Sequence, residues 1–139
     1  MMNRFYHLAR YNAGLSTLMN GTGFMVKMDV IRDEGWNTKT LTEDIEFSLM
    51  SIAKGRKLGW AVDAIVYDEQ PVTFKASWSQ RSRWTVGHLQ CMKEYTGKLI
   101  NGVKEYKTLM NFDGALYLFG IPMMLLTFLL LGVNTLLYL

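Results

Sequence analysis

A long uncharged run at the C-terminal end constrains the fold of this chain more than any other feature. Residues 114–139 contain no charged side chain over 26 positions. At about 1.5 Å per residue, a helix of this length spans ~39 Å, which exceeds the ~30 Å hydrocarbon core of a bilayer. The preceding residues are too few to enclose a helix that is apolar on every side. We therefore predict a transmembrane helix and assign residues 112–139 to it.

The basic residues predict on which side of the membrane the rest of the chain lies. All 15 Lys and Arg residues precede the uncharged run. By the positive-inside rule, we expect the soluble part to face the cytoplasm at the cytoplasmic (inner) membrane. Cys91 is the only cysteine, which agrees with a reducing compartment. Residues 70–110 hold seven bases and two acids, a balance that favours the phosphates of lipids or nucleotides. The bilayer is an expected partner, and nucleic acid is not.

Hydrophobic periodicity divides the preceding residues into helices and strands. Apolar side chains follow helical spacing in residues 2–12, 29–34, 43–54 and from residue 73 onward. The apolar segments 15–19 and 57–67 suit strands. We therefore expect an α/β domain in residues 1–72, followed by interfacial amphipathic helices in residues 73–111.

Paired carboxylates lie at the start of the predicted helix 43–54. Glu43 and Asp44 follow Thr42, and a carboxylate can take a proton from an attacking hydroxyl. The alternative is structural, because acids in a first helical turn also interact favourably with the helix dipole. Asp44 and Glu46 do not suggest a metal site, since residues two apart on a helix point in nearly opposite directions.

A second motif, Gln80-x-x-Arg83-Trp84, lies in the predicted helix from residue 73 onward. Spacings of three and four place an amide, a guanidinium and an indole on one helical face. Such a face can bind a pyrophosphate and stack on a sugar ring. The alternative is an interfacial helix whose arginines meet lipid headgroups and whose tryptophan lies in the aromatic belt.

A third candidate segment consists of Asn20, Gly21, Thr22 and Gly23. Two glycines that flank a hydroxyl allow the backbone to approach a ligand closely. The alternative is an ordinary turn, because turns flanked by glycine are common.

The order of these motifs, followed by a transmembrane helix, resembles the second half of the membrane-bound family-2 glycosyltransferases. These include the processive synthases of cellulose, chitin and hyaluronan and the chitooligosaccharide synthases. The resemblance implies a nucleotide-sugar glycosyltransferase domain of the GT-A type. It also implies an inverting hexosyltransferase that builds a polysaccharide or glycolipid from a UDP-sugar. The partners would be this nucleotide-sugar donor and a carbohydrate or lipid-linked acceptor.

The resemblance assigns a role to each motif. Asp44, with Glu43 beside it, would be the base that deprotonates the acceptor hydroxyl. Arg83 and Arg81 would hold the donor diphosphate. The acceptor would contact Gln80, Trp84, Asn20, Gly21, Thr22 and Gly23. These roles require Asp44 and Arg83 to converge on a shared cleft.

One part of the family's pattern is missing from the sequence. The family holds Mg or Mn on the diphosphate through an Asp-x-Asp motif, and no Asp-x-Asp occurs in the 139 residues. His7 and His88 have no second ligand in evidence, so we expect no metal on the residues present. We expect a C-terminal or internal piece of the enzyme, which transfers no sugar by itself. Another chain could supply the missing donor-binding half.

Two other functions remain open. A non-catalytic membrane adaptor would bind anionic lipid through the basic helix, and Gln80 would then be dispensable. A non-processive transferase that acts on a lipid-linked sugar would differ from a polymer synthase in the length of its product.

Overall fold

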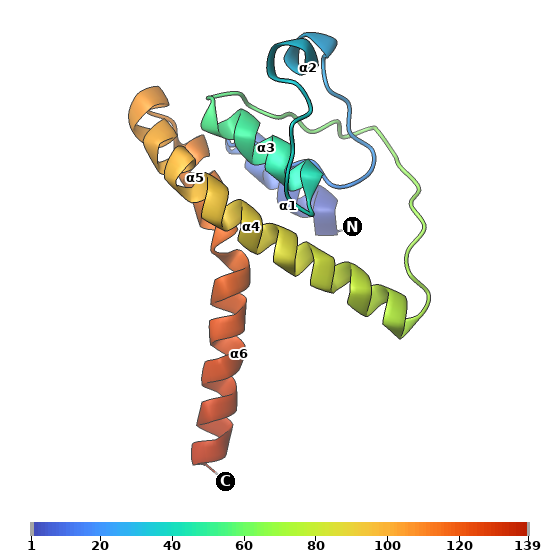
Figure 1. Ribbon diagram of the computed structural model, residues 1–139, viewed down its shortest axis with the longest axis vertical. Coiled ribbons are helices and arrows are strands. Elements are labelled where there is room, and N and C mark those ends of the chain that lie inside the picture. Colours follow the sequence, from blue (N-terminus) through green and yellow to red (C-terminus); the bar gives the residue numbers. More distant parts are fainter. Residues whose placement is uncertain (1, 139) are drawn as a thin grey trace.

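The chain folds into six helices within residues 2–138, the part that the computed structural model describes. In chain order they are α1 (Met2–Asn12), α2 (Met28–Glu34), α3 (Glu43–Ala53), α4 (Phe74–Tyr106), α5 (Leu109–Leu118) and α6 (Gly120–Leu137). The helix α3 packs against α4 and α5, whereas α6 extends away from them (Figure 1).

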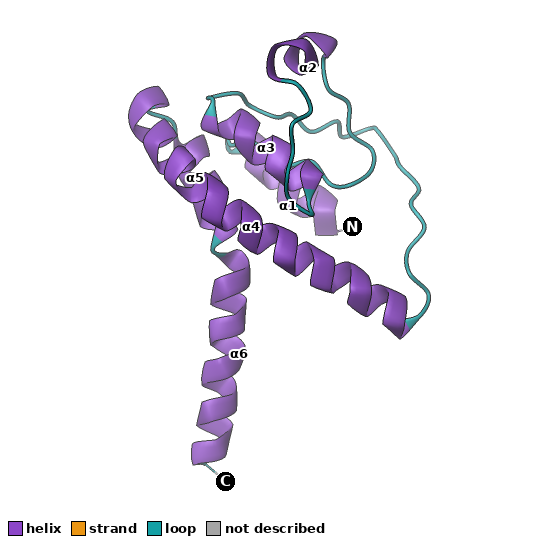
Figure 2. Cartoon of the chain, viewed as in Figure 1, coloured by secondary structure: helices purple, strands orange, loops and turns teal. Residues whose placement is uncertain are grey.

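The predicted α/β fold of the GT-A type is wrong, because residues 2–138 contain no strand (Figure 2). The two segments predicted as strands do approach each other, but only one backbone hydrogen bond joins them, from the Thr17 N–H to the Leu58 carbonyl at 3.2 Å. Side chains make the other links: the Leu58 N–H donates to the Ser16 hydroxyl at 3.0 Å, and the Thr17 hydroxyl donates to the Gly59 carbonyl at 2.8 Å. A sheet needs a repeating backbone ladder, which these side-chain bonds replace.

The core forms where α3 packs between α4 and α5. The predicted helix 43–54 is confirmed, and Leu49 and Ile52 of its apolar stripe are fully buried. They pack against Leu99 of α4 and Leu118 of α5. The buried Asn111 side chain donates to the Ile52 carbonyl at 2.8 Å, and so satisfies one of the carbonyls that a helix leaves free at its C-terminal end.

The helix α4 is a single 33-residue helix. The Thr73 hydroxyl caps its start by accepting a hydrogen bond from the Ala76 N–H at 3.3 Å. Residues 74–86 are mostly exposed and project beyond the core, whereas residues 87–106 pack against α3 and α5 (Figure 1). The Gln80-x-x-Arg83-Trp84 motif therefore lies on the projecting part.

The uncharged C-terminal run is divided between two helices. Its first residues belong to α5, which packs against α4 and contributes Ala115 and Leu118 to the core. The following helix, α6, is the one described helix whose length and composition suit a membrane span. Its 18 residues are all outside the core, and at about 1.5 Å each they extend ~27 Å, close to the thickness of a hydrocarbon core.

The close approach of α4 to α5 depends on Gly102, and we predict that Gly102→Ala lowers the free energy of unfolding by about 1–3 kcal/mol. A Cβ atom on Gly102 would stand 2.2 Å from Asn111 Nδ2 and 3.1 Å from the Ala53 carbonyl oxygen. Urea unfolding in detergent micelles measures the change. The matched control is Gly97→Ala in the same helix, where a Cβ meets nothing within 4 Å. Gly97→Ala should raise the free energy of unfolding by up to about 1 kcal/mol. If both variants lowered the free energy of unfolding equally, the packing described for Gly102 would be contradicted.

Candidate active site

The structure brings together Asp44 and the glycine turn 20–23, two of the three candidate motifs. Asp44 lies in the first turn of α3, and the nearby backbone N–H groups of Ile45 and Gly21 act on its carboxylate by lowering its pKa. The Asp44 Oδ2 atom is 3.8 Å from the position that a Cβ on Gly21 would occupy. An acceptor bound against the turn would therefore lie beside the carboxylate.

A buried hydroxyl fixes this arrangement. Ser48 is completely buried; its Oγ donates to the Asp44 carbonyl at 2.7 Å and accepts from the Met19 N–H at 2.8 Å. It thus joins the segment that enters the glycine turn to the first turn of α3. Sequence reasoning did not identify Ser48, because only the folded chain shows that this hydroxyl lies next to Met19.

The surroundings of Asp44 increase its affinity for a proton. Burial is the main cause and raises the pKa of Asp44, and the Glu43 charge raises it further. The N–H groups of Ile45 and Gly21 act in the opposite direction but do not cancel the effect of burial. A carboxylate with a raised pKa is a stronger base than an exposed aspartate.

Glu46 holds the loop that leads into this site. It is 2% exposed, and its Oε2 accepts hydrogen bonds from the backbone N–H groups of Lys39 at 2.7 Å and Thr40 at 2.6 Å. Its Oε1 accepts from the Tyr95 hydroxyl of α4 at 3.0 Å. Burial alone would raise the pKa of Glu46, but these hydrogen bonds lower it overall. One ionised carboxylate therefore ties the loop to α3 and α4.

A glycine in α4 sets the distance between α4 and the start of α3. A Cβ on Gly87 would stand 2.6 Å from Thr42 Cγ2 and 2.9 Å from the Thr42 backbone nitrogen. Gly87 follows Arg83 by one helical turn, so both residues lie on the same face of α4. No hydrogen bond or ion pair joins the Arg83 guanidinium to the Asp44 carboxylate, so the convergence of the two groups on a shared cleft stays a prediction.

The Gln80-x-x-Arg83-Trp84 motif presents its groups to solvent on this face. Arg83 is exposed and makes no hydrogen bond to another described residue, Trp84 is 45% exposed, and Gln80 is partly buried. Arg81 points to a different side of α4, and its Nε donates to the Ser77 hydroxyl at 3.3 Å. Gln80, Arg83 and Trp84 thus share the face of α4 on which Gly87 lies, whereas Arg81 lies on another face.

A histidine of α1 supports the glycine turn. His7 is 4% exposed, its Nε2 lies 3.3 Å from Asn20 Nδ2, and its ring stacks on Trp60 with centroids 5.1 Å apart. Burial, with the Arg10 charge, lowers the pKa of His7. His7 is therefore a buried residue of the helical domain. Nothing in the sequence spacing indicated its contact with Asn20.

The other residues of the turn face solvent. Gly21, Thr22 and Gly23 are exposed. Gly23 adopts a φ of 69°, and a Cβ there would stand 2.4 Å from Val66 Cγ2, so only glycine fits this position without strain.

The described residues do not form a site for Mg²⁺ or Mn²⁺. No group of three or more His, Cys, Asp or Glu side chains converges among residues 2–138. His88 is buried, and its Nε2 donates to the Leu118 carbonyl at 2.9 Å. A divalent cation on a diphosphate needs several oxygen ligands, and the described residues bring no such set of carboxylates together.

The sequence of the whole chain matches a known family of transferases. Residues 1–139 match the sequence model of the family described as Glycosyl transferase family group 2. The chain therefore belongs to this glycosyltransferase family.

Three relatives illustrate the similarity. A glucomannan 4-beta-mannosyltransferase 7 of Arabidopsis thaliana is 30% identical over 71% of this chain and 19% of its own length. The probable glycosyltransferase YdaM of Bacillus subtilis is 33% identical over 49% of this chain and 16% of its own length. A glucomannan 4-beta-mannosyltransferase 1 of Cyamopsis tetragonoloba is 30% identical over 71% of this chain and 20% of its own length. The chain thus spans about a fifth of these curated relatives. No solved structure matches it.

Removal of the Glu46 carboxylate should destabilise the fold. We predict that Glu46→Ala lowers the free energy of unfolding by about 3 kcal/mol, because the buried Tyr95 hydroxyl and the partly buried N–H groups of Lys39 and Thr40 lose their acceptor. Glu94→Ala is the matched control, since Glu94 is exposed and pairs with Lys98 at the surface; its loss should be much smaller than that of Glu46→Ala. Urea unfolding of both variants is the measurement, and a loss for Glu46→Ala no greater than for Glu94→Ala would be inconsistent with this role.

Ionisation of Asp44 should lower the stability of the fold, and this loss should increase with pH. Its raised pKa means that the folded state holds the proton more tightly than the unfolded state, so stability is lost as pH rises through the folded pKa. Asp44→Asn should therefore be more stable than the wild type at pH 7, and its advantage should grow as pH rises from the ordinary aspartate value of 3.8. Urea midpoints measured at several pH values test this, with Asp68→Asn on the exposed loop as the control. An advantage that shrinks as pH rises would contradict it.

Proposed function

We propose that this chain carries the acceptor-activating residues of an inverting hexosyltransferase that transfers a sugar from a UDP-sugar to a growing polysaccharide or glycolipid. The observation that supports this most strongly is the position of Asp44. Its partly buried carboxylate, which has a raised affinity for protons, lies against the glycine turn. The proposal requires Arg83 and Trp84, which are exposed on α4, to face the same substrate as Asp44.

Each group has a place in a single displacement at the anomeric carbon. The Asp44 carboxylate takes the proton from the acceptor hydroxyl, and the hydroxyl oxygen forms a bond to the anomeric carbon. The bond from that carbon to the diphosphate oxygen breaks, and the nucleoside diphosphate leaves with the electron pair. Attack from the side opposite the leaving group inverts the configuration. Glu43, which is exposed beside Asp44, helps keep the proton on Asp44 through its charge.

The donor and acceptor occupy opposite sides of this centre in the proposal. Arg83 balances the charge of the departing diphosphate, because a guanidinium binds phosphate through paired N–H groups. Arg81, on another side of α4, contributes less. Gln80 and Trp84 line the acceptor end together with Asn20, Gly21, Thr22 and Gly23. The names of the mannosyltransferase relatives support a hexose donor and a polysaccharide product.

The proposal places the helical domain on the cytoplasmic face of the membrane, with α6 as the anchor. The uncharged helix α6 follows all 15 basic residues, which agrees with the positive-inside rule. We also propose domain boundaries near residues 72 and 111, and a processive reaction. The length of the product, measured by mass spectrometry, separates polymer synthesis from a single transfer to a lipid-linked acceptor.

The divalent cation of the complete enzyme, Mg or Mn, would be held by residues outside this chain. The 139 residues contain no Asp-x-Asp, and residues 2–138 bring no metal-binding cluster together. The chain alone should therefore transfer no sugar from a UDP-sugar above the level of its Asp44→Asn variant.

A second function, a membrane adaptor without catalysis, is favoured by one observation. Phe74 and Trp78 on the projecting part of α4 are 82% and 65% exposed and stack on each other. Exposed aromatic residues of this kind can insert at the surface of a bilayer. If this were the only function, neutral substitutions at Gln80 and Asp44 would change nothing.

A graft tests the proposed catalysis. The chain replaces the matching region of a full-length relative, and sugar transfer by the graft is measured against pH. Asp44→Asn should lower kcat at least 100-fold, the usual scale for loss of a general base. Arg83→Ala should lower kcat/KM about tenfold or more. Lys75→Ala, exposed on the same helix, should have no effect.

The pH dependence provides an independent check on the graft. Because the base must be deprotonated, and burial raises the pKa of Asp44, the wild-type rate should fall on the acidic side at a pH above the ordinary aspartate range. An Asp44→Asn graft within threefold of the wild type would overturn the assignment.

A further inference from the structure

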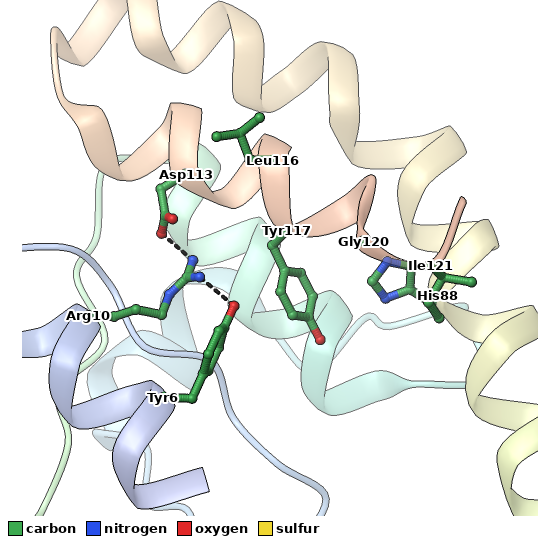
Figure 3. A pocket seen from close by; sticks show the side chains of 8 residues that line it. All are labelled: Tyr6, Arg10, His88, Asp113, Leu116, Tyr117, Gly120 and Ile121. Atoms are coloured by element: carbon green, nitrogen blue, oxygen red, sulfur yellow. Dashed lines mark hydrogen bonds and ion pairs between the residues drawn. The ribbon is translucent and has the colours of Figure 1, made fainter. Parts of the chain in front are cut away.

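A hollow of about 530 Å³ lies where α1, α4 and α5 meet the start of α6 (Figure 3). Tyr6 and Arg10 of α1 line it together with Asp113 and Tyr117 of α5. The helix α6, which suits a membrane span, contributes Ile121 to its rim. If α6 crosses a bilayer, the hollow lies at the level where headgroups give way to hydrocarbon.

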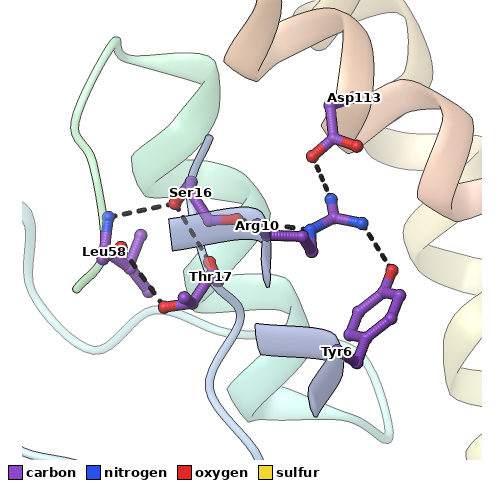
Figure 4. A network of polar contacts seen from close by, with 6 residues as sticks. All are labelled: Tyr6, Arg10, Ser16, Thr17, Leu58 and Asp113. Atoms are coloured by element: carbon purple, nitrogen blue, oxygen red, sulfur yellow. Dashed lines mark hydrogen bonds and ion pairs between the residues drawn. The ribbon is translucent and has the colours of Figure 1, made fainter. Parts of the chain in front are cut away.

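The hollow holds one positive and one negative side chain. The Arg10 guanidinium forms an ion pair with the Asp113 carboxylate and donates a hydrogen bond to the Tyr6 hydroxyl (Figure 4). Among the described residues, no other Lys, Arg, Asp or Glu lines the hollow. Burial lowers the pKa of His88, which favours its neutral form. A ligand with a single charge would meet a like charge from one member of the pair, whereas a zwitterion can match both.

Both members of the pair keep hydrogen-bonding capacity for a ligand. Their side chains remain 12% and 21% exposed, and the contact uses only the Oδ2 atom of Asp113. The other carboxylate oxygen can accept further hydrogen bonds. The contacts of Arg10 with Tyr6, Asp113 and the Ser16 carbonyl take one N–H from each of its three nitrogens, and a guanidinium carries more donors than that.

Two phenolic hydroxyls add hydrogen-bond donors beside the guanidinium. The Tyr6 hydroxyl accepts from Arg10, so its own proton is available to a ligand. The Tyr117 hydroxyl makes no hydrogen bond to another described residue. A guanidinium with adjoining hydroxyls is a suitable set of donors for the oxygens of a phosphodiester.

Apolar surface continues from the hollow along α6. Leu116 lines the hollow and is 55% exposed. Met124, Leu125 and Phe128 follow Ile121 at helical spacing, so all four lie on one face of α6, and these three side chains are at least half exposed. A ligand with a polar head in the hollow and hydrocarbon chains on this face would cover both surfaces. This extent of apolar surface favours a lipid over a small polar molecule.

We propose that the hollow binds the headgroup of phosphatidylethanolamine, with the acyl chains along α6. The phosphodiester accepts hydrogen bonds from Arg10 and from the hydroxyls of Tyr6 and Tyr117, and the primary ammonium donates to Asp113. A choline headgroup has no N–H to donate to Asp113, and phosphatidylglycerol has no cation for it. The inference goes beyond the proposed function, because none of these residues takes part in the proposed sugar transfer.

Native mass spectrometry of the full chain tests the lipid preference. The chain in detergent micelles is titrated separately with phosphatidylethanolamine, phosphatidylcholine and phosphatidylglycerol that have the same acyl chains. Phosphatidylethanolamine should bind about fivefold or more tightly than either other lipid, the scale of one ion pair near a surface. A smaller preference, or tighter binding of another lipid, would overturn the inference. Because no sugar is present, the result does not depend on the proposed transfer.

Variants locate the lipid in the hollow. Asp113→Asn removes the acceptor for the ammonium and leaves Arg10 without its carboxylate, so the preference should reverse in favour of phosphatidylglycerol. Tyr117→Phe keeps the ring, whose centroid is 5.2 Å from that of His88, and should weaken phosphatidylethanolamine binding about threefold. Asp29→Asn, exposed on α2, is the matched control and should change nothing.

Circular dichroism measures the helix content of each variant, and Tyr117→Phe decides the outcome if Asp113→Asn does not fold. A wild-type preference in folded Asp113→Asn would reject the site. Unchanged phosphatidylethanolamine binding in Tyr117→Phe, or an equal loss in Asp29→Asn, would place the lipid elsewhere and also reject it.

Discussion

The buried carboxylate of Glu46 is the contact on which the arrangement of the candidate site depends. It binds the loop before α3 through two backbone N–H groups and binds α4 through the Tyr95 hydroxyl. A carboxylate can remain ionised in a buried place only when such donors compensate for its lost hydration. The direction in which α3 begins, and with it the position of Asp44, follows from this one group.

A second set of polar contacts joins the helical domain to the start of α6. His88 of α4 donates to the Leu118 carbonyl at the end of α5, and the Arg10–Asp113 ion pair connects α1 to α5. These contacts fix the helix ends immediately before the candidate membrane span. The domain and α6 therefore meet at a defined junction, and the hollow proposed to bind a phospholipid headgroup lies at that junction.

Prediction from the sequence succeeded for local features and failed for pairing between distant segments. The stripe of Leu49 and Ile52 identified α3, and the spacing of Gln80, Arg83 and Trp84 identified their shared face on α4, because helical periodicity is a property of consecutive residues. The apolar residues in segments 15–19 and 57–67 indicated strands, but Ser16 and Thr17 satisfy the backbone of the opposite segment with their hydroxyls. Apolar composition cannot show which group will occupy a hydrogen-bonding position.

The sequence by itself determined the uncharged run, the faces of the long helices and the order of motifs that places the chain in its glycosyltransferase family. Only the tertiary structure decided that Ser48 and Gly21 lie beside Asp44, and that the buried Glu46 carboxylate connects the loop before α3 to α4. It also decided that α5 is separate from α6 and packs in the core. The physical reason is the range of the interactions. Periodicity and charge act over a few neighbouring residues, whereas the contacts of Ser48 with Met19 and of Glu46 with Tyr95 join residues more than twenty positions apart and form only when the helices pack.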